Sequence, residues 1–166
     1  MKMELIQPFL DAADAVLAES LRCSTRVADL TMDEEIYRRR GIAAIVSIQG
    51  DIEGRVIFDV EPATAVRVAS ALAGGPVTES DDLARETVCE LANMITGNAV
   101  TLLNDQGFRF RVQPPEVHTA PLGLEGSQDT EALVMSFETP HGSVTLNISM
   151  RYSALRASDR AALVSD

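Results

Sequence analysis

The sequence predicts an α+β domain, in which two long helices and a shorter one pack on an antiparallel sheet of about six strands that contains two β-hairpins. Three segments repeat apolar residues every three or four positions, as amphipathic helices do. Five others alternate apolar and polar residues, as half-buried strands do. The order of these segments pairs neighbouring strands and contains no repeated βαβ unit, so the sheet is expected to be antiparallel.

The first half of the chain begins with a helix over 4–21. Its apolar stripe consists of Leu5, Phe9, Ala12, Ala13, Val16, Leu17 and Ser20. A weak strand near Val27 and a solvated connection containing the Arg38–Arg40 run are expected next. Alternation over 42–48 and 56–60, separated by turn residues at 50–54, predicts the first hairpin.

The second half begins with a short helix, which opens at Pro62 and stops at Gly74-Gly75-Pro76. Ser80 is expected to cap a longer helix over about 80–103. The core stripe of the short helix consists of Ala65, Val68, Ala69 and Leu72. The core stripe of the longer helix consists of Ala84, Val88, Leu91, Ile95, Ala99 and Leu102. A strand over 108–112, an irregular proline-rich segment and a hairpin over 133–152 complete the predicted domain.

Length and charge limit the function. The 166 residues fit one domain, with a core over about 5–152 and a helical or frayed tail over 153–166. The formal charge of −11 disfavours binding to nucleic acid or to an anionic membrane. No apolar run is long enough to span a bilayer, so we expect a soluble, cytoplasmic chain. Cys23 and Cys89 suggest neither a disulfide nor a zinc site.

The long helix carries an unusual polar face. Glu86, Glu90, Asn93 and Gly97 share one stripe, roughly opposite the apolar stripe, and Met94 lies beside Glu90. Asn93, Thr96, Gly97 and Asn98 each disfavour a helix interior by roughly 0.5–1 kcal/mol relative to Ala. This concentration of weak helix formers suggests a requirement other than helix stability.

Glu90 and Asn93 are three residues apart, so they lie on neighbouring helical turns. A carboxylate can pair with a cation of another molecule, and a carboxamide can hold a water molecule through its donor and its acceptor. The same spacing is common by chance, so the residues alone leave an ordinary solvated face as the alternative. No catalytic triad, phosphate-binding loop or metal-ligand cluster is visible elsewhere, and His118 and His141 are expected to be structural.

The stretch Glu90-Leu-Ala-Asn-Met-Ile-Thr-Gly-Asn98 resembles the signature helix of the CheX-like members of the CheC/CheX/FliY chemotaxis phosphatase family. Three further segments are similar to motifs of that family: Gln7–Leu10, Gly50–Val56 and Pro115–Val117. The resemblance covers about residues 5–152. Cys89 departs from it, because relatives commonly carry a small residue such as glycine there.

This resemblance implies a phosphatase that removes the aspartyl phosphate of a CheY-like response regulator. Glu90 and Asn93 would be catalytic: Asn93 would orient the attacking water, and Glu90 would pair with a lysine of the partner. Glu86, Met94 and Gly97 would contact the partner. The chain would need no cofactor or metal of its own, since the phosphorylated partner would carry Mg²⁺. A docking module that binds a receiver or a flagellar component without catalysis is the alternative.

The resemblance also implies a homodimer with one site per chain. In the first helix Glu19 is followed three residues later by Arg22 rather than by asparagine, so no second catalytic pair is present there. The last strand, over 144–152, is long and regular and lacks the proline or bulge signals of a protected edge. We therefore expect another strand or another chain to cover that strand.

Overall fold

The computed structural model describes residues 3–33, 37–38, 40–77, 82–118, 124–125 and 132–153. Its helices are α1 (Met3–Leu21), α2 (Pro62–Ala73) and α3 (Asp82–Asp105). Its strands are β1 (Arg26–Asp33), β2 (Tyr37–Arg38), β3 (Ile42–Gly50), β4 (Ile52–Val60), β5 (Phe110–Val112), β6 (Glu116–His118), β7 (Leu124–Glu125), β8 (Ala132–Thr139) and β9 (Gly142–Tyr152).

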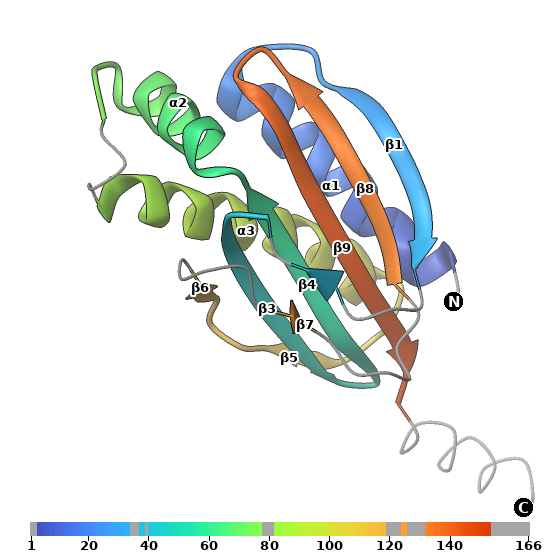
Figure 1. Ribbon diagram of the computed structural model, residues 1–166. Helices are drawn as coiled ribbons and strands as arrows, with labels where there is room; N and C mark the ends of the chain where they lie inside the picture. The colour runs from blue at the N-terminus through green and yellow to red at the C-terminus, as the bar shows by residue number, and fades with distance from the viewer. Residues whose placement is uncertain are drawn as a thin grey trace, which may run out of the picture.

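The main sheet has the strand order β1-β8-β9-β4-β3, and β5 and β6 both pair with the outer side of β3 (Figure 1). Every pair is antiparallel. The β3–β4 and β8–β9 hairpins are the two that the alternation predicts. The predicted α+β class with an antiparallel sheet is thus confirmed.

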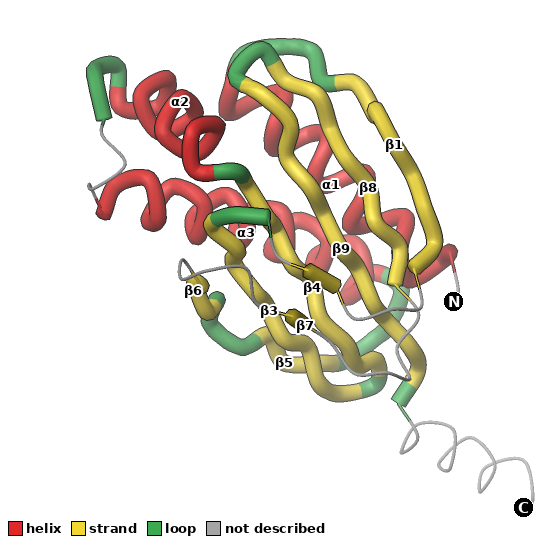
Figure 2. Tube along the Cα trace, in the orientation of Figure 1, coloured by secondary structure: helices red, strands yellow, loops and turns green. Residues whose placement is uncertain are grey.

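All three helices lie on one side of the sheet (Figure 2). α1 and α3 pack against each other and against the strands, and α2 packs mainly against α3. The core between the layers contains large, fully buried side chains, among them Phe9 of α1, Ile95 of α3, Phe58 of β4 and Leu146 of β9. This packing fixes α3 firmly against the sheet, because one face of the helix is removed from water along most of its length.

The ends of the helices agree only in part with the predicted signals. Pro62 occupies the first turn of α2, and Gly74 closes that helix with a left-handed φ of 75° and an N–H bond to the Ser70 carbonyl. The predicted cap Ser80 lies outside the described residues. Leu72 and Leu102 were expected in the core, but both are 43% exposed. In α3 the buried position is Leu103, four residues after Ala99, and the helix extends to Asp105.

The largest differences from the prediction concern strands. The weak strand near Val27 is an eight-residue strand, β1, which pairs along its length with β8. The proline-rich segment contains β6, which pairs with Ala43, Ala44 and Ile45 of β3. In both cases pairing with a distant strand, rather than local alternation, determines the conformation. Of the predicted tail, only Ser153 lies within the described residues.

The last strand is covered by other strands of the same chain, which is one of the two alternatives expected from the sequence. β9 lies inside the sheet and is paired on one side with β8 and on the other with β4. Its length and regularity therefore reflect a central position, since both edges of the strand are satisfied within the chain.

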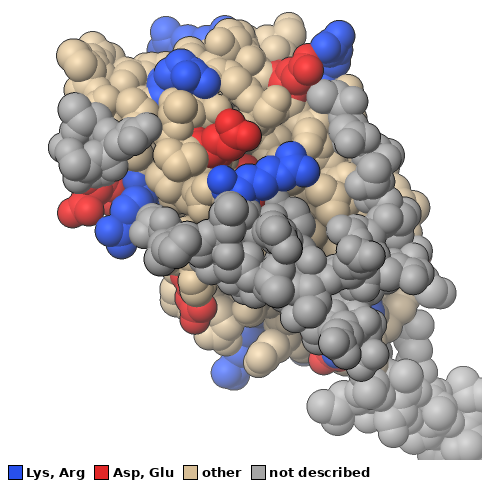
Figure 3. Space-filling model, in the orientation of Figure 1, with Lys and Arg blue, Asp and Glu red and all other residues tan. Residues whose placement is uncertain are grey.

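The face of the sheet away from the helices carries a second, small apolar cluster of Ala43, Ile57 and Val134. In Figure 3, which views the molecule from this side, basic and acidic side chains are mixed over its described part. No helix in the described part of the chain is both long and apolar enough to cross a membrane.

Candidate functional site

Helix α3 presents the predicted polar stripe to solvent. Its buried side consists of Ala84, Thr87, Val88, Leu91, Ala92, Ile95, Thr96, Ala99 and Leu103. Because these residues hold the helix against the sheet, the opposite side is left outside the core. Glu86, Glu90, Asn93 and Gly97 are all exposed, and Met94 is 43% exposed.

Glu90 and Asn93 carry polar groups that no described residue engages. Neither side chain makes a hydrogen bond or an ion pair to another residue within the described part of the chain. Near them, Arg85 and Asp82 form an ion pair, with 3.5 Å between Arg85 Nη1 and Asp82 Oδ1. A carboxylate and an amide that no neighbouring side chain satisfies keep their full hydrogen-bonding capacity for a partner or for water.

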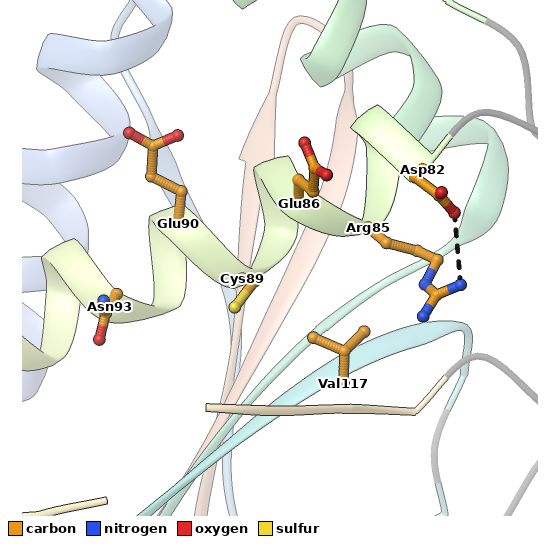
Figure 4. Close-up of a pocket in the computed structure, with 7 residues that line it drawn as sticks. All are labelled: Asp82, Arg85, Glu86, Cys89, Glu90, Asn93 and Val117. Atoms are coloured by element: carbon orange, nitrogen blue, oxygen red, sulfur yellow. Dashed lines mark hydrogen bonds and ion pairs between the residues drawn. The ribbon is translucent and has the colours of Figure 1, made fainter. Parts of the chain in front are cut away.

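The two groups do not point to one spot. Figure 4 shows the carboxylates of Glu86 and Glu90 on the flank of α3 away from Val117, and the Asn93 amide and the Cys89 thiol on the same flank as Val117. The side chains of Glu90 and Asn93 thus project to opposite flanks of the exposed side of α3, the exposed ridge of the helix. It can address two different points of a partner, one by charge and one by hydrogen bonding.

A groove of about 510 Å³ runs between α3 and β6 along this ridge. It is lined by Asp82, Arg85, Glu86, Cys89, Glu90, Asn93 and Val117. Three carboxylates and one guanidinium of α3 line it, and that guanidinium is paired with Asp82. The groove is therefore acidic on balance, and a basic side chain of a partner would be attracted to its Glu86–Glu90 side.

The sequence did not indicate that Val117 forms the wall opposite α3. Val117 takes this place because β6 pairs with β3, with Val117 opposite Ala44. Only the similarity of Pro115–Val117 to a family motif hinted at a role for the segment. Cys89 is half-buried in the groove next to Glu90, and both cysteines are free, half-buried thiols.

Each of the two histidines contacts another residue of the chain. His118 Nε2 lies 3.7 Å from Glu116 Oε2 on the same strand. The backbone of His141 accepts a hydrogen bond from Arg67 Nε at 2.6 Å, in the turn between β8 and β9. Over the residues that the structure describes, no three His, Cys, Asp or Glu side chains are grouped so that they could hold a metal ion.

Comparison with known proteins decides the family. The family model described as chemotaxis phosphatase CheX matches residues 42–138, which include the whole of α3 and the first hairpin. The chain belongs to the CheX family. The CheY-P phosphatase CheX of Thermotoga maritima is 34% identical over 77 residues, which make up 46% of this chain and 50% of that protein. The chain therefore spans about half the length of the curated relative that it matches.

Solved structures confirm the fold over nearly the whole chain. A CheC-like superfamily protein from Shewanella sp. PV-4 superposes with a TM-score of 0.80 at 21% identity, covering 91% of this chain and 99% of that one. The CheX–CheY–BeF₃–Mg²⁺ complex from Borrelia burgdorferi gives a TM-score of 0.70 at 29% identity, with coverage of 90% and 99%. The fold class is thus that of the CheC/CheX-like proteins.

Proposed function

We propose that this chain dephosphorylates the aspartyl phosphate of a CheY-like response regulator, and that it does so by placing Glu90 and Asn93 in the active site of that partner. One observation carries the proposal. In a member of the CheX family, an exposed carboxylate and an exposed amide stand on neighbouring turns of a rigidly packed helix, and no other described residue engages them.

Asn93 acts on the water. Hydrolysis of an acyl phosphate needs a water molecule in line with the bond that breaks, and the catalytic gain comes from fixing that water. The Asn93 carbonyl accepts a hydrogen bond from the water, while its NH₂ group donates to a phosphoryl oxygen. An amide suits this task because it provides both a donor and an acceptor without titrating.

Glu90 sets the register of the complex. Its carboxylate pairs with a lysine of the receiver, and Glu86 adds negative charge one turn earlier on the same flank. The receiver supplies the Mg²⁺ that neutralises the phosphoryl oxygens, so this chain contributes geometry rather than a metal. The relative crystallised from Borrelia burgdorferi, a CheX–CheY–BeF₃–Mg²⁺ complex, supports this division of roles.

Gly97 and Met94 belong to the same contact surface. A Cβ atom added to Gly97 would have no described atom within 4 Å beyond its neighbours in the chain and the backbone of its own helix. Internal packing therefore does not require a glycine at this position. Alanine would stabilise the helix by about 1 kcal/mol relative to glycine, so the glycine needs another explanation. Close approach of a partner backbone explains the missing side chain. Met94, an exposed and adaptable apolar side chain beside Glu90, provides contact area there.

Assembly and location follow from the same proposal. The family resemblance implies a homodimer with one catalytic pair per chain, and we retain it, although β9 cannot be the contact edge. Among the described strands β1, β5 and β6 stand at the edges of the sheet. Light scattering should give a mass near twice 17.9 kDa. A cytoplasmic location is part of the proposal, because phosphorylated receivers are cytoplasmic substrates.

The test is phosphate release from a panel of phosphorylated receiver domains from the genome that encodes this chain, measured with and without the protein. We expect faster release from at least one receiver, with no nucleotide and no metal beyond that bound by the receiver. The control is the double variant Glu90→Ala/Asn93→Ala, which should not accelerate release. If one receiver binds tightly but its dephosphorylation is unchanged, the chain is a docking module and the phosphatase proposal is wrong.

A further inference from the structure

A second hollow lies next to the groove, on the other side of Asn93. It has a volume of about 450 Å³ and opens between α3 and the segment that joins β5 to β6. Asn93 lines both the groove and the hollow. The hollow walls are formed by Thr96, Gly97 and Val100 on the helix and by 112–115 on the other side.

The hollow differs chemically from the groove. None of its lining residues is ionisable, and the wall opposite the helix consists of Val112, Gln113, Pro114 and Pro115. The chain as a whole carries a formal charge of −11, and the neighbouring groove contains three carboxylates. The uncharged lining therefore suits an apolar or neutral segment, since a charged group would lose its hydration there without gaining an opposite charge.

Thr96 adds a polar group to which no described residue bonds. The residue is 1% exposed, and Thr96 Oγ1 is a buried side-chain atom without a hydrogen-bond partner among the described residues. The other two threonines of α3 behave differently: Thr87 donates to the Leu83 carbonyl at 2.7 Å and Thr101 to the Gly97 carbonyl at 3.0 Å. A buried hydroxyl without a partner is costly. Because this oxygen is sealed from solvent, a partner group can bond to it only if the Thr96 side chain turns towards the hollow when the partner binds.

We propose that this hollow receives a short uncharged loop of the phosphorylated receiver, with one apolar side chain between α3 and Pro114-Pro115 and one backbone group bonded to Thr96 Oγ1. The inference rests on the proposed function. A receiver whose phosphoryl group reaches Asn93 must extend over the hollow, because Asn93 and Val100 are separated by only about 10 Å along the helix axis. Glu90 would then bind a basic residue of the receiver, and the hollow would bind the uncharged loop of the receiver that lies beside that residue.

The experiment uses the full chain and the receiver identified in the panel, treated with beryllofluoride and Mg²⁺ to mimic the phosphorylated state. Binding is measured by titration, and kcat and KM are measured with the phosphorylated form. Val112→Asp introduces a charge at a side chain that is 36% exposed in the hollow. Leu72→Asp is its matched control, because Leu72 is a similarly exposed apolar residue on α2, away from the hollow.

We expect Val112→Asp to weaken binding and raise KM about tenfold, the factor that loss of one buried apolar contact produces, with kcat at saturation unchanged. Leu72→Asp should match the wild type in both. Thr96→Val removes only the hydroxyl, so it should raise KM about threefold to tenfold while thermal unfolding occurs at or above the wild-type temperature. If Val112→Asp does not fold, Thr96→Val carries the test.

The outcomes separate this inference from the proposed function. If the wild type dephosphorylates the receiver and both hollow variants match it, the hollow lies outside the interface and only the inference falls. A lower kcat with unchanged KM in either variant also overturns it. If the wild type binds the receiver without catalysis and the variants weaken binding, the hollow is supported and the phosphatase activity is rejected. If the wild type binds no receiver, both proposals fall.

Discussion

Helices α1 and α3 pack side by side on the same face of the sheet, yet they use their exposed residues in different ways. Three exposed polar side chains of α1 take part in hydrogen bonds within the chain: Gln7 donates to Asp11 at 2.8 Å, and Thr25 donates to Asp14 at 2.5 Å. Glu90 and Asn93 of α3 make no such bonds to the described residues.

The two helices also differ in how much of each is buried. Ten of the nineteen residues of α1 are buried, but only nine of the twenty-four of α3. α1 thus contributes mostly to the core, while α3 combines a core face with an exposed side that holds Glu90, Asn93 and several weak helix formers. The contrast teaches where a helix can act on a partner: at polar groups that no described residue of its own chain engages.

The largest expected effect concerns the core role of α1. Phe9 is fully buried, so Phe9→Ala should lower the free energy of unfolding by about 3–5 kcal/mol through lost burial and a cavity. Met94→Ala on the exposed side of α3 should change it by less than about 0.5 kcal/mol. Urea unfolding measures both values. Equal destabilisation by the two variants would contradict the assignment of separate roles.

The catalytic role that we propose for α3 predicts the next effect. Asn93→Ala should lower kcat about 100-fold with little change in affinity for the receiver, because the water loses its fixed position while the contact surface remains. Asn104→Ala, an exposed asparagine in the last turn of the same helix, is the control and should be fully active. A full kcat for Asn93→Ala at saturating receiver would remove Asn93 from the mechanism.

Glu90 should affect engagement more than turnover. Loss of a charged hydrogen bond typically weakens binding about tenfold or more, so Glu90→Ala should raise KM by such a factor, and the difference should shrink at high salt. Asp11→Ala and Asp14→Ala on α1 should retain wild-type kinetics. Loss of catalysis in well-folded Asp11 or Asp14 variants would show that α1 carries a second site.

The elements that could be predicted from sequence are those with a strong local pattern. The α1 stripe, the β3–β4 hairpin and the Pro62 and Gly74 signals of α2 all depend on residues within a few positions of each other. β1 and β6 could not be predicted at their true extent, because each depends on pairing with a strand distant in sequence. For the same reason the sequence left open whether another strand or another chain covers β9.

The site divides in a similar way. The exposure of Glu90 and Asn93 follows from helical periodicity alone, so it could be predicted. Val117 and the unpaired hydroxyl of Thr96 could not, because the opposing wall of the groove and hollow depends on how the segment after β5 folds back along α3. The divergent directions of the Glu90 and Asn93 side chains likewise became visible only in the structure.

The smallest expected effect is that of Gly97→Ala, a variant in which stability and binding of the receiver should change in opposite directions. Gly97→Ala adds a methyl group that meets no described atom beyond its neighbours in the chain and the backbone of its own helix, so it should stabilise α3 by about 1 kcal/mol and raise Tm by about 2–4 °C. If a partner backbone approaches closely there, the same methyl should raise KM several-fold. The Asn104→Ala control should show unchanged KM, since its added helix propensity lies away from the contact surface. A more stable Gly97→Ala protein with wild-type KM would mean that the glycine serves no contact and that Gly97 leaves the partner-binding set.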